Sequence, residues 1–320
     1  MTLKICTFNI LAPVWAQPIY YPDSSHSKLS WSYRLPIIET FLNIIKDSCS
    51  IICLQEVTDD YTEIIDGVIY NRVGTYNDLK NIFGNSWHAI FVANDINYWN
   101  NWYANDPTSP YAKIKHGTAV FLKKSVFIQF TLTDLSLSNS GNHCAWIETS
   151  YNDQKYHIAS IHLDSDNGGN RNAEFNDLIN YANYRKTIDP SAHQIICGDF
   201  NTSTQEGNLS NDIRTSEFKN YLVELSKLTG INLYESTRPA YYGHGYELDH
   251  VIIRGPSVNT NYMSNAPHGL PSTTISGVID YNVWVEYPIT KPLLKVTNDS
   301  RIAKNFDNCG SDHFPVVITI

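Results

Sequence analysis

The sequence has 320 residues, of which 42% are hydrophobic and 17% charged, and these values exclude an intrinsically disordered chain and predict a substantial core. The formal net charge of −9 excludes a broad electropositive surface that would collect nucleic acid nonspecifically; it suits local capture of a phosphate through a metal ion, or a small substrate. The N-terminus lacks a signal-peptide pattern and no apolar run reaches about 18 residues, so we expect a cytoplasmic or nuclear protein that does not associate with membranes.

Strand-like apolar runs recur along the whole chain. Strands are predicted at residues 4–10, 50–57, 87–93, 117–124, 126–132, 144–150, 155–163, 193–200, 248–254, 282–287 and 315–320. Several of these runs are continuously apolar for four or more residues, which is typical of strands that are covered on both faces.

Helical periodicity appears between the strands. Helices are predicted at 33–48, 171–188 and 215–230, with apolar stripes formed by Leu35, Ile38, Phe41, Leu42 and Ile45, by Phe175, Leu178, Ile179, Ala182 and Tyr184, and by Phe218, Leu222 and Leu225. Because strands alternate with helices and no linker interrupts them, the sequence predicts one α/β domain over residues 1–320, with two sheets and helices outside. We expect a monomer.

The remaining polar stretches are predicted loops. Residues 93–115 form a long polar-aromatic segment, and residues 255–290 mix Pro, Gly, Ser and Asn around one short strand. Long loops in compact domains are often functional, so both are candidate substrate-binding segments.

The six cysteines contain no CxxC pair, and Cys6, Cys53, Cys144 and Cys197 lie inside apolar strand-like runs. We therefore expect buried free thiols in a reducing compartment rather than disulfides. No Cys/His cluster has the ligand spacing of a zinc site.

Polar residues stand where the apolar strands end or begin. They are Asn9, Gln55 and Glu56, His162, Asp199 with Asn201, Asp249, and Asp312 with His313. Alone, each is ambiguous, since an Asn is commonly a turn former and a His is commonly a structural side chain. Gathered at one edge of an α/β sheet, they would form a site for a hard divalent cation and a phosphate, because oxygen ligands suit Mg²⁺ or Mn²⁺ better than Zn²⁺.

Six motifs in this order carry a resemblance: TFNIL, LQEV, IHLDS, GDFN, ELDHVII and SDHFP. From residue 5 to the end, the chain resembles the endonuclease/exonuclease/phosphatase superfamily of nucleases, phosphatases and phosphodiesterases. The resemblance implies a deoxyribonuclease I-like fold, a four-layer α/β sandwich of two mixed sheets flanked by helices. It also implies a metal-dependent phosphodiester hydrolase.

The resemblance also implies roles for the residues at the strand ends. Glu56 is the principal Mg²⁺ or Mn²⁺ ligand, with Asn9 beside it and Asp312 close to the metal. Asp199 orients or deprotonates the attacking water, Asn201 hydrogen-bonds the phosphate, and His162 and His313 stabilise charge on the phosphoryl oxygens. Asp249 fixes the tautomer and orientation of His313.

The N-terminal segment narrows the resemblance to the deadenylase-like branch, which includes the carbon-catabolite-repressor-type deadenylases, nocturnin, the angel proteins and a 2′-phosphodiesterase. The LSWSYR stretch at residues 29–34 matches the opening of that branch. We expect single-stranded RNA, or another nucleic-acid phosphodiester, as substrate, and a 3′ exoribonuclease of deadenylase type. The candidate substrate-binding residues are Trp31, Arg34, Trp99, Trp102, Tyr241 and Tyr242, since aromatic side chains can stack on unpaired bases.

The sequence also leaves other substrate classes possible. His116 stands before Gly117 where the branch has an acidic residue, and His250 replaces the usual Tyr after Asp249. The IHLDS stretch is similar to a motif of tyrosyl-DNA phosphodiesterases. The alternatives are a nuclease acting on DNA ends or abasic sites, and a phosphatase acting on RNA ends or another phosphoester. A catalytically inactive adaptor is disfavoured, because no residue of the expected catalytic set is missing.

Overall fold

The computed structural model places most of the chain before residue 203 and several shorter segments after it. It describes residues 3–18, 20–21, 24–65, 68–72, 74–98, 115–138, 140–165, 167–202, 232–237, 241–242, 246–255, 310–313 and 316–319. Of these, 61–65, 68–72, 232–237, 241–242, 246–247 and 316–319 are described by their backbone alone.

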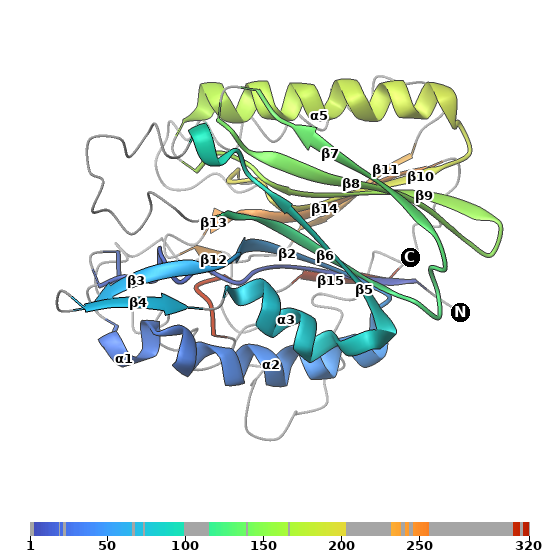
Figure 1. The fold of residues 1–320 in the computed structure, drawn as a ribbon. Helices are drawn as coiled ribbons and strands as arrows, with labels where there is room; N and C mark the ends of the chain where they lie inside the picture. Colours follow the sequence, from blue (N-terminus) through green and yellow to red (C-terminus); the bar gives the residue numbers. More distant parts are fainter. Residues whose placement is uncertain are drawn as a thin grey trace, which may run out of the picture.

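Two mixed sheets form the centre of the fold (Figure 1). The five-stranded sheet has the order β15 (Val316–Thr319), β1 (Lys4–Asn9), β2 (Ile51–Thr58), β6 (His116–Lys123), β5 (Trp87–Ala93). The six-stranded sheet has the order β11 (Asn232–Thr237), β14 (Asp249–Gly255), β10 (His193–Asp199), β9 (Gln154–His162), β8 (His143–Tyr151), β7 (Phe130–Ser136). The pairs β1–β2 and β9–β10 are parallel, and the other pairs in the two sheets are antiparallel.

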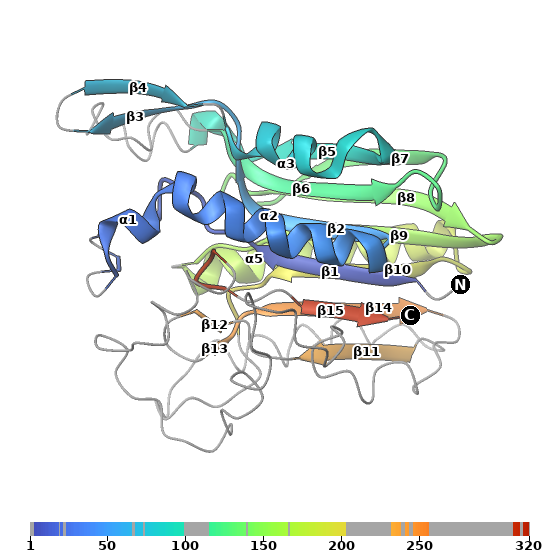
Figure 2. The same cartoon turned by 90° about the horizontal axis from the view of Figure 1, so that it is seen from below.

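Helices cover the outer faces of both sheets (Figures 1 and 2). The five-stranded sheet carries α2 (Trp31–Ser48) and α3 (Thr75–Phe83), and the six-stranded sheet carries α5 (Gly168–Ile188). The smaller elements are α1 (His26–Leu29), the 3₁₀ turn η1 (Gly84–Ser86), and the hairpins β3 (Tyr61–Ile65)–β4 (Val68–Arg72) and β12 (Tyr241–Tyr242)–β13 (Tyr246–Glu247).

Apolar side chains fill the three spaces between these four layers. Ile5, Cys53 and Val120 meet Ile158 and Cys197 between the two sheets. The other faces of the same strands pack on the helices, as expected for runs that are apolar at consecutive positions. The predicted four-layer sandwich is therefore confirmed.

The helical stripes differ from prediction at two positions. Arg34 rather than Leu35 is fully buried on α2, and Tyr184 on α5 is 58% exposed. Tyr184 lies two residues after the buried Ala182, a step of about 200° that turns it to solvent.

Several element boundaries also differ. The sequence predicts a strand at 126–132, but residues 124–126 form a turn and β7 begins only at Phe130. The elements that the prediction missed are α1, β3, β4, α3, η1, β11, β12 and β13. The helix α3 is short, and no side chain caps it between Gly74 and Gly84. The predicted helix at 215–230, the strand at 282–287, residues 99–114 of the first predicted loop and 256–290 of the second lie outside the described residues.

Five cysteines are buried free thiols, as predicted: Cys6, Cys49, Cys53, Cys144 and Cys197. Cys309 lies outside the described residues. Among the described helices, none combines the length and apolar character needed to cross a membrane.

Candidate active site

The polar residues predicted from the sequence lie at one rim of the facing sheets. In the six-stranded sheet, Asp199 is the register partner of both His162 and Asp249, so these residues stand on three adjacent strands. In the five-stranded sheet, Asn9 ends β1 beside Glu56 on β2. The Asn9 side-chain amide donates to Asp199 Oδ2 at 3.0 Å, which joins the two sheets at this rim.

A β-bulge turns Glu56 into the site. The pairing of β2 with β6 shifts so that Gln55 and Glu56 together oppose Thr118, and Glu56 adopts the left-handed conformation with φ 58°. Its Oε1 accepts from Asn9 Nδ2 at 2.8 Å, and its Oε2 accepts from the Ala12 backbone N–H at 2.8 Å. A strained backbone that re-aims a carboxylate is typical of a functional position.

Burial raises the pKa of Glu56, which is only 8% exposed. The nearby His162 acts in the opposite direction, the charge of Asp312 raises the pKa further, and the hydrogen bonds from Asn9 and Ala12 lower it. A buried carboxylate with a raised pKa gains from a cation placed beside it.

Asn9 is oriented by its own loop. Its Oδ1 accepts from the Leu11 N–H at 2.9 Å, and its Nδ2 donates to both Glu56 and Asp199. The amide nitrogen therefore faces the carboxylates, whereas the resemblance implies a metal ligand, which would offer the oxygen. In this structure Asn9 holds the two carboxylates together.

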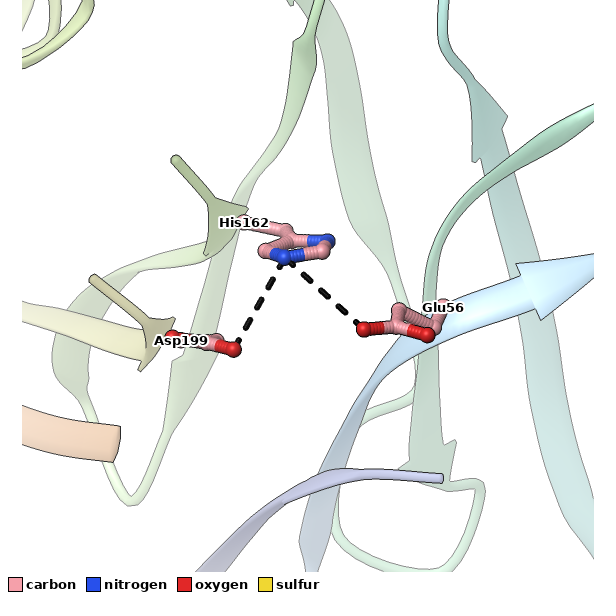
Figure 3. A group of neighbouring side chains, drawn as sticks. All are labelled: Glu56, His162 and Asp199. Carbon is pink, nitrogen blue, oxygen red and sulfur yellow. Dashed lines mark ion pairs between the residues drawn. The ribbon is translucent and has the colours of Figure 1, made fainter. Parts of the chain in front are cut away.

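His162 lies between the carboxylates of the two sheets (Figure 3). Its Nε2 is 3.7 Å from Asp199 Oδ2 and 4.0 Å from Glu56 Oε1. The imidazole is 17% exposed, more than the 2% of the Asp199 side chain. It is therefore a group that a substrate could reach.

His313 and Asp249 form a buried pair. His313 Nδ1 is 2.8 Å from Asp249 Oδ2, and its Nε2 is 3.7 Å from Asp199 Oδ2. Burial alone would lower the pKa of His313, but the carboxylates of Asp249, Asp312 and Asp199 outweigh it and raise the pKa well above its ordinary value. Burial in turn raises the pKa of Asp249. The pair directs a proton-carrying Nε2 toward Asp199.

Asp312 is anchored on its other side. The Tyr21 hydroxyl donates to Asp312 Oδ2 at 2.6 Å, and the Ser311 hydroxyl donates to the Asn9 carbonyl at 2.7 Å. The segment before β15 is thus fixed to the loop that follows β1.

Two residues around Asp199 require unusual backbone conformations. Gly198 has φ 145°, and a Cβ there would lie 1.9 Å from the Ile161 carbonyl oxygen, so the close approach of β9 demands glycine. Asn201 has φ 49°; its N–H donates to Asp199 Oδ1 at 2.9 Å and its Nδ2 donates to the Leu163 carbonyl at 2.8 Å.

The donor set fits a hard divalent cation. One ligand atom from each of Glu56, His162 and Asp199 lies within 4.8 Å of the others, and the same holds for Asp199, Asp249 and His313. The carboxylates buried around this point, Glu56, Asp199, Asp249 and Asp312, outnumber the imidazoles of His162 and His313. A bound cation would offset this concentration of negative charge.

Trp31 and Arg34, predicted to bind substrate, contact the protein itself. Trp31 Nε1 donates to Asp78 Oδ2 at 2.8 Å, which links α2 to α3. Arg34 has no exposed surface, and its Nη1 donates to the carbonyls of Ile10, Leu11 and Gly310 at 2.9 to 3.1 Å. Arg34 therefore supports the loop after Asn9 from inside.

The other candidate substrate-binding residues cannot be placed in this way. Trp99 and Trp102 lie outside the described residues, and for Tyr241 and Tyr242 only the backbone is described, in β12. The sequence reasoning gave no role to Tyr21 or Ser311. Neither belongs to a periodic element. The available signals were that Tyr21 lies in the loop before LSWSYR and that Ser311 is the first residue of the SDHFP motif.

A model of the Endonuclease/Exonuclease/phosphatase family matches residues 7–313. The chain belongs to this family. Members of the family are metal-dependent phosphoester hydrolases, and so is this protein. Among curated proteins, none matches the sequence.

Solved structures of the family share the fold. The catalytic domain of human nocturnin with bound sulfate has 15% identity, coverage of 99% of this chain and 92% of that one, and a TM-score of 0.53. ANGEL2, a 2′,3′-cyclic phosphatase, has 12% identity, coverage of 100% and 95%, and a TM-score of 0.56. Truncated Caenorhabditis elegans TDP2 has 13% identity, coverage of 100% and 97%, and a TM-score of 0.51. At these identities the likeness establishes the deoxyribonuclease I-like architecture.

Proposed function

We propose that the protein removes nucleotides from the 3′ end of single-stranded RNA as an exoribonuclease of deadenylase type, with Mg²⁺ or Mn²⁺ as its metal. One network carries the hydrolytic part of this proposal: Asn9 joins Glu56 to Asp199, and two imidazoles face Asp199. The choice of RNA rests on the LSWSYR resemblance at 29–34 and on the net charge of −9, which disfavours nonspecific binding of duplex DNA.

Glu56 is the proposed metal ligand, with Asp312 and Asn9 beside it. When bound, a divalent ion supplies charge neutralisation at a non-bridging phosphate oxygen. The chain prepares Glu56 for this by burying it and by holding both its oxygens, one through Asn9 and one through the Ala12 N–H.

Asp199 is proposed to orient the attacking water and accept its proton. Its Oδ1 is occupied by the Asn201 N–H, so Oδ2 is the oxygen that faces the other groups of the site. General-base help of this kind contributes about 10²–10⁴-fold to rate. Asn201, fixed beside Asp199, would hydrogen-bond the phosphate through its side chain.

The imidazoles of His162 and His313 are proposed to stabilise negative charge as it grows on the phosphoryl oxygens. Asp249 holds Nδ1 of His313 through a hydrogen bond, so Nε2 is the ring nitrogen that faces Asp199 and the rest of the site. Fixed donors in a site with little water act more strongly than the same groups in water.

A substrate panel tests the proposal. We would incubate the protein with Mg²⁺ or Mn²⁺ and 5′-labelled oligo(A), a mixed-sequence RNA, an RNA ending in a 2′,3′-cyclic phosphate, and an abasic DNA duplex. Shortening of the RNAs in single-nucleotide steps supports the proposal. Cleavage of the abasic duplex alone, or removal of the terminal phosphate alone, would contradict it.

A second candidate rests on a different observation. The IHLDS stretch, which contains His162 and Asp164, is similar to a motif of tyrosyl-DNA phosphodiesterases. This similarity favours hydrolysis of a phosphotyrosyl bond at a DNA end. Release of tyrosine from such an oligonucleotide, without RNA shortening, would select this candidate.

A further inference from the structure

One peptide group links the site to the buried face of α5. The peptide between Leu163 and Asp164 is the second peptide after His162, the last residue of β9. Its oxygen, on Leu163, accepts from Asn201 Nδ2 at 2.8 Å, and its N–H, on Asp164, donates to Glu174 Oε2 at 2.7 Å. A single rigid amide therefore joins Asn201 to Glu174.

Glu174 is a fully buried carboxylate outside the metal cluster. It lies in the second turn of α5, and its Oε1 accepts from the Ser140 hydroxyl and from Asn142 Nδ2, the latter at 2.8 Å. These donors come from the loop between β7 and β8. With the Asp164 N–H they give the ionised carboxylate three hydrogen bonds.

The backbone on either side of this peptide is also held by hydrogen bonds. The Leu163 N–H donates to the Asp199 carbonyl at 2.9 Å, so the chain after His162 stays paired to the chain before Asn201. Arg171, one turn earlier on α5 than Glu174, donates to the Asp164 carbonyl at 2.9 Å. The three consecutive peptides after His162 are thus each hydrogen-bonded to α5, to the Asp199–Asn201 turn, or to both.

A charged acceptor on the N–H of a peptide also strengthens its carbonyl as an acceptor, because hydrogen bonds in a chain polarise one another. The Glu174 carboxylate therefore tightens the bond between Leu163 O and the Asn201 amide. The rotation of that amide decides where its remaining polar atoms point.

We propose that Glu174 is a positioning residue that orients Asn201 and His162 through the Leu163–Asp164 peptide. This inference rests on the proposed function, because it gives Asn201 and His162 their roles toward the phosphate. It goes beyond that function by assigning part of the rate to a carboxylate that does not contact the substrate.

Kinetics of four variants test the proposal. Glu174→Ala should lower kcat by about 10–100-fold, the range seen when outer residues that orient a site are lost, with KM changed less than about threefold. Glu174→Gln keeps an oxygen that can accept the Asp164 N–H but carries no charge, so it should recover part of the loss. Asn142→Ala removes one of the two donors to the other oxygen of Glu174 and should leave kcat near that of the wild type.

Asp177→Ala is the matched control. Asp177 lies one turn further along α5 and accepts from the Ser138 N–H at 2.7 Å, so it fixes the same β7–β8 loop without touching Asp164. A folded Glu174→Ala variant with unchanged kcat, or an equal loss in Asn142→Ala or Asp177→Ala, would overturn the proposal.

A readout without substrate separates this inference from the proposed function. In protein labelled with ¹⁵N-asparagine, the side-chain amide signal of Asn201, assigned with Asn201→Ala, should shift in Glu174→Ala and return toward the wild-type position in Glu174→Gln. No cleavage of any substrate would contradict the proposed function alone. An Asn201 signal that is the same in wild type and Glu174→Ala would overturn the positioning role.

Discussion

Asp199 is the residue at which the two halves of the site meet. Its Oδ2 lies within 3.0 Å of Asn9 on the other sheet and 3.7 Å from both His162 and His313. Because one carboxylate oxygen serves three neighbours, its loss removes proton acceptance and also the alignment of the imidazoles.

We expect Asp199→Asn to lower kcat by about 10²–10⁴-fold with little change in fold, because the amide has the same shape but accepts no proton. Single-turnover rates on the substrate identified by the panel give the measurement, with circular dichroism to verify the fold. Asp134→Asn is the matched control, since Asp134 lies on the edge strand β7 and pairs with His143 of β8. Loss of less than about tenfold in Asp199→Asn would contradict its role.

Glu174 also makes a prediction about stability and pH. Burial raises its pKa to about 7, against 4.5 for the free side chain. Between these values the folded state binds more protons than the unfolded state, so stability falls as pH rises from 4.5 to 7 and changes no further above that range.

Replacement by Gln removes this titration. The free energy of unfolding should therefore fall by up to about 3 kcal/mol more in the wild type than in Glu174→Gln when the pH is raised from 4.5 to 8. Urea denaturation at the two pH values measures the difference. An identical pH dependence in the two proteins would show that Glu174 titrates normally in the fold.

At the scale of elements, α2 fastens the loop after β1 through Arg34. This side chain is fully buried, yet its Nη1 donates to three backbone carbonyls, of Ile10, Leu11 and Gly310, from two distant parts of the chain. Its Nε donates to a fourth carbonyl, that of Leu29, at 3.1 Å. The Ser311 bond to the Asn9 carbonyl lies next to these contacts. The helix thus sets the relative position of the loop after β1, whose Ala12 N–H contacts Glu56, and of the segment that carries Asp312.

We expect Arg34→Met to destabilise the protein by about 3–5 kcal/mol, because it leaves buried carbonyls without donors. Arg34→Lys should recover only part of this, since an ammonium cannot reproduce the planar fork of a guanidinium. Urea midpoints measure both. Glu39→Ala, at an exposed position of the same helix, should change stability by less than about 0.5 kcal/mol. A midpoint for Arg34→Met equal to that of Glu39→Ala would contradict the prediction.

Some features of the helices and strands could be predicted from the sequence, and others could not. Continuous apolar runs identified β1, β2, β9 and β10, because strands covered on both faces leave that pattern. Motif order identified the polar residues at their ends. The bulge at Glu56, the buried Arg34 and the Glu174 contact to Asp164 depend on partners far away in the chain, so no local pattern predicts them.

At the scale of the whole molecule, the site exists only while the two sheets stay packed. Glu56 belongs to one sheet and Asp199 to the other, and Asn9 connects them. A cation bound by carboxylates from both sheets would therefore stabilise the folded protein as a whole.

We expect saturating Mg²⁺ or Mn²⁺ to raise the Tm, and EDTA to remove both this gain and the activity. At a metal concentration 100 times the Kd, the gain corresponds to about 2.7 kcal/mol. Glu56→Gln should lose most of the metal-induced shift while folding normally without metal, because the amide relieves a buried charge. Differential scanning calorimetry gives the measurement, and an unchanged metal response in Glu56→Gln would place the ion elsewhere.

The buried thiols make the three packed spaces separately observable. Cys6 lies between the five-stranded sheet and its helices, Cys53 between the sheets, and Cys144 beneath α5. Burial raises the pKa of Cys6 and Cys144, so few of these thiols are ionised and none is exposed in the folded protein. An alkylating reagent can therefore modify them only after the surrounding layers separate. The order in which these cysteines become labelled under mild denaturant would reveal which two layers of the sandwich separate first.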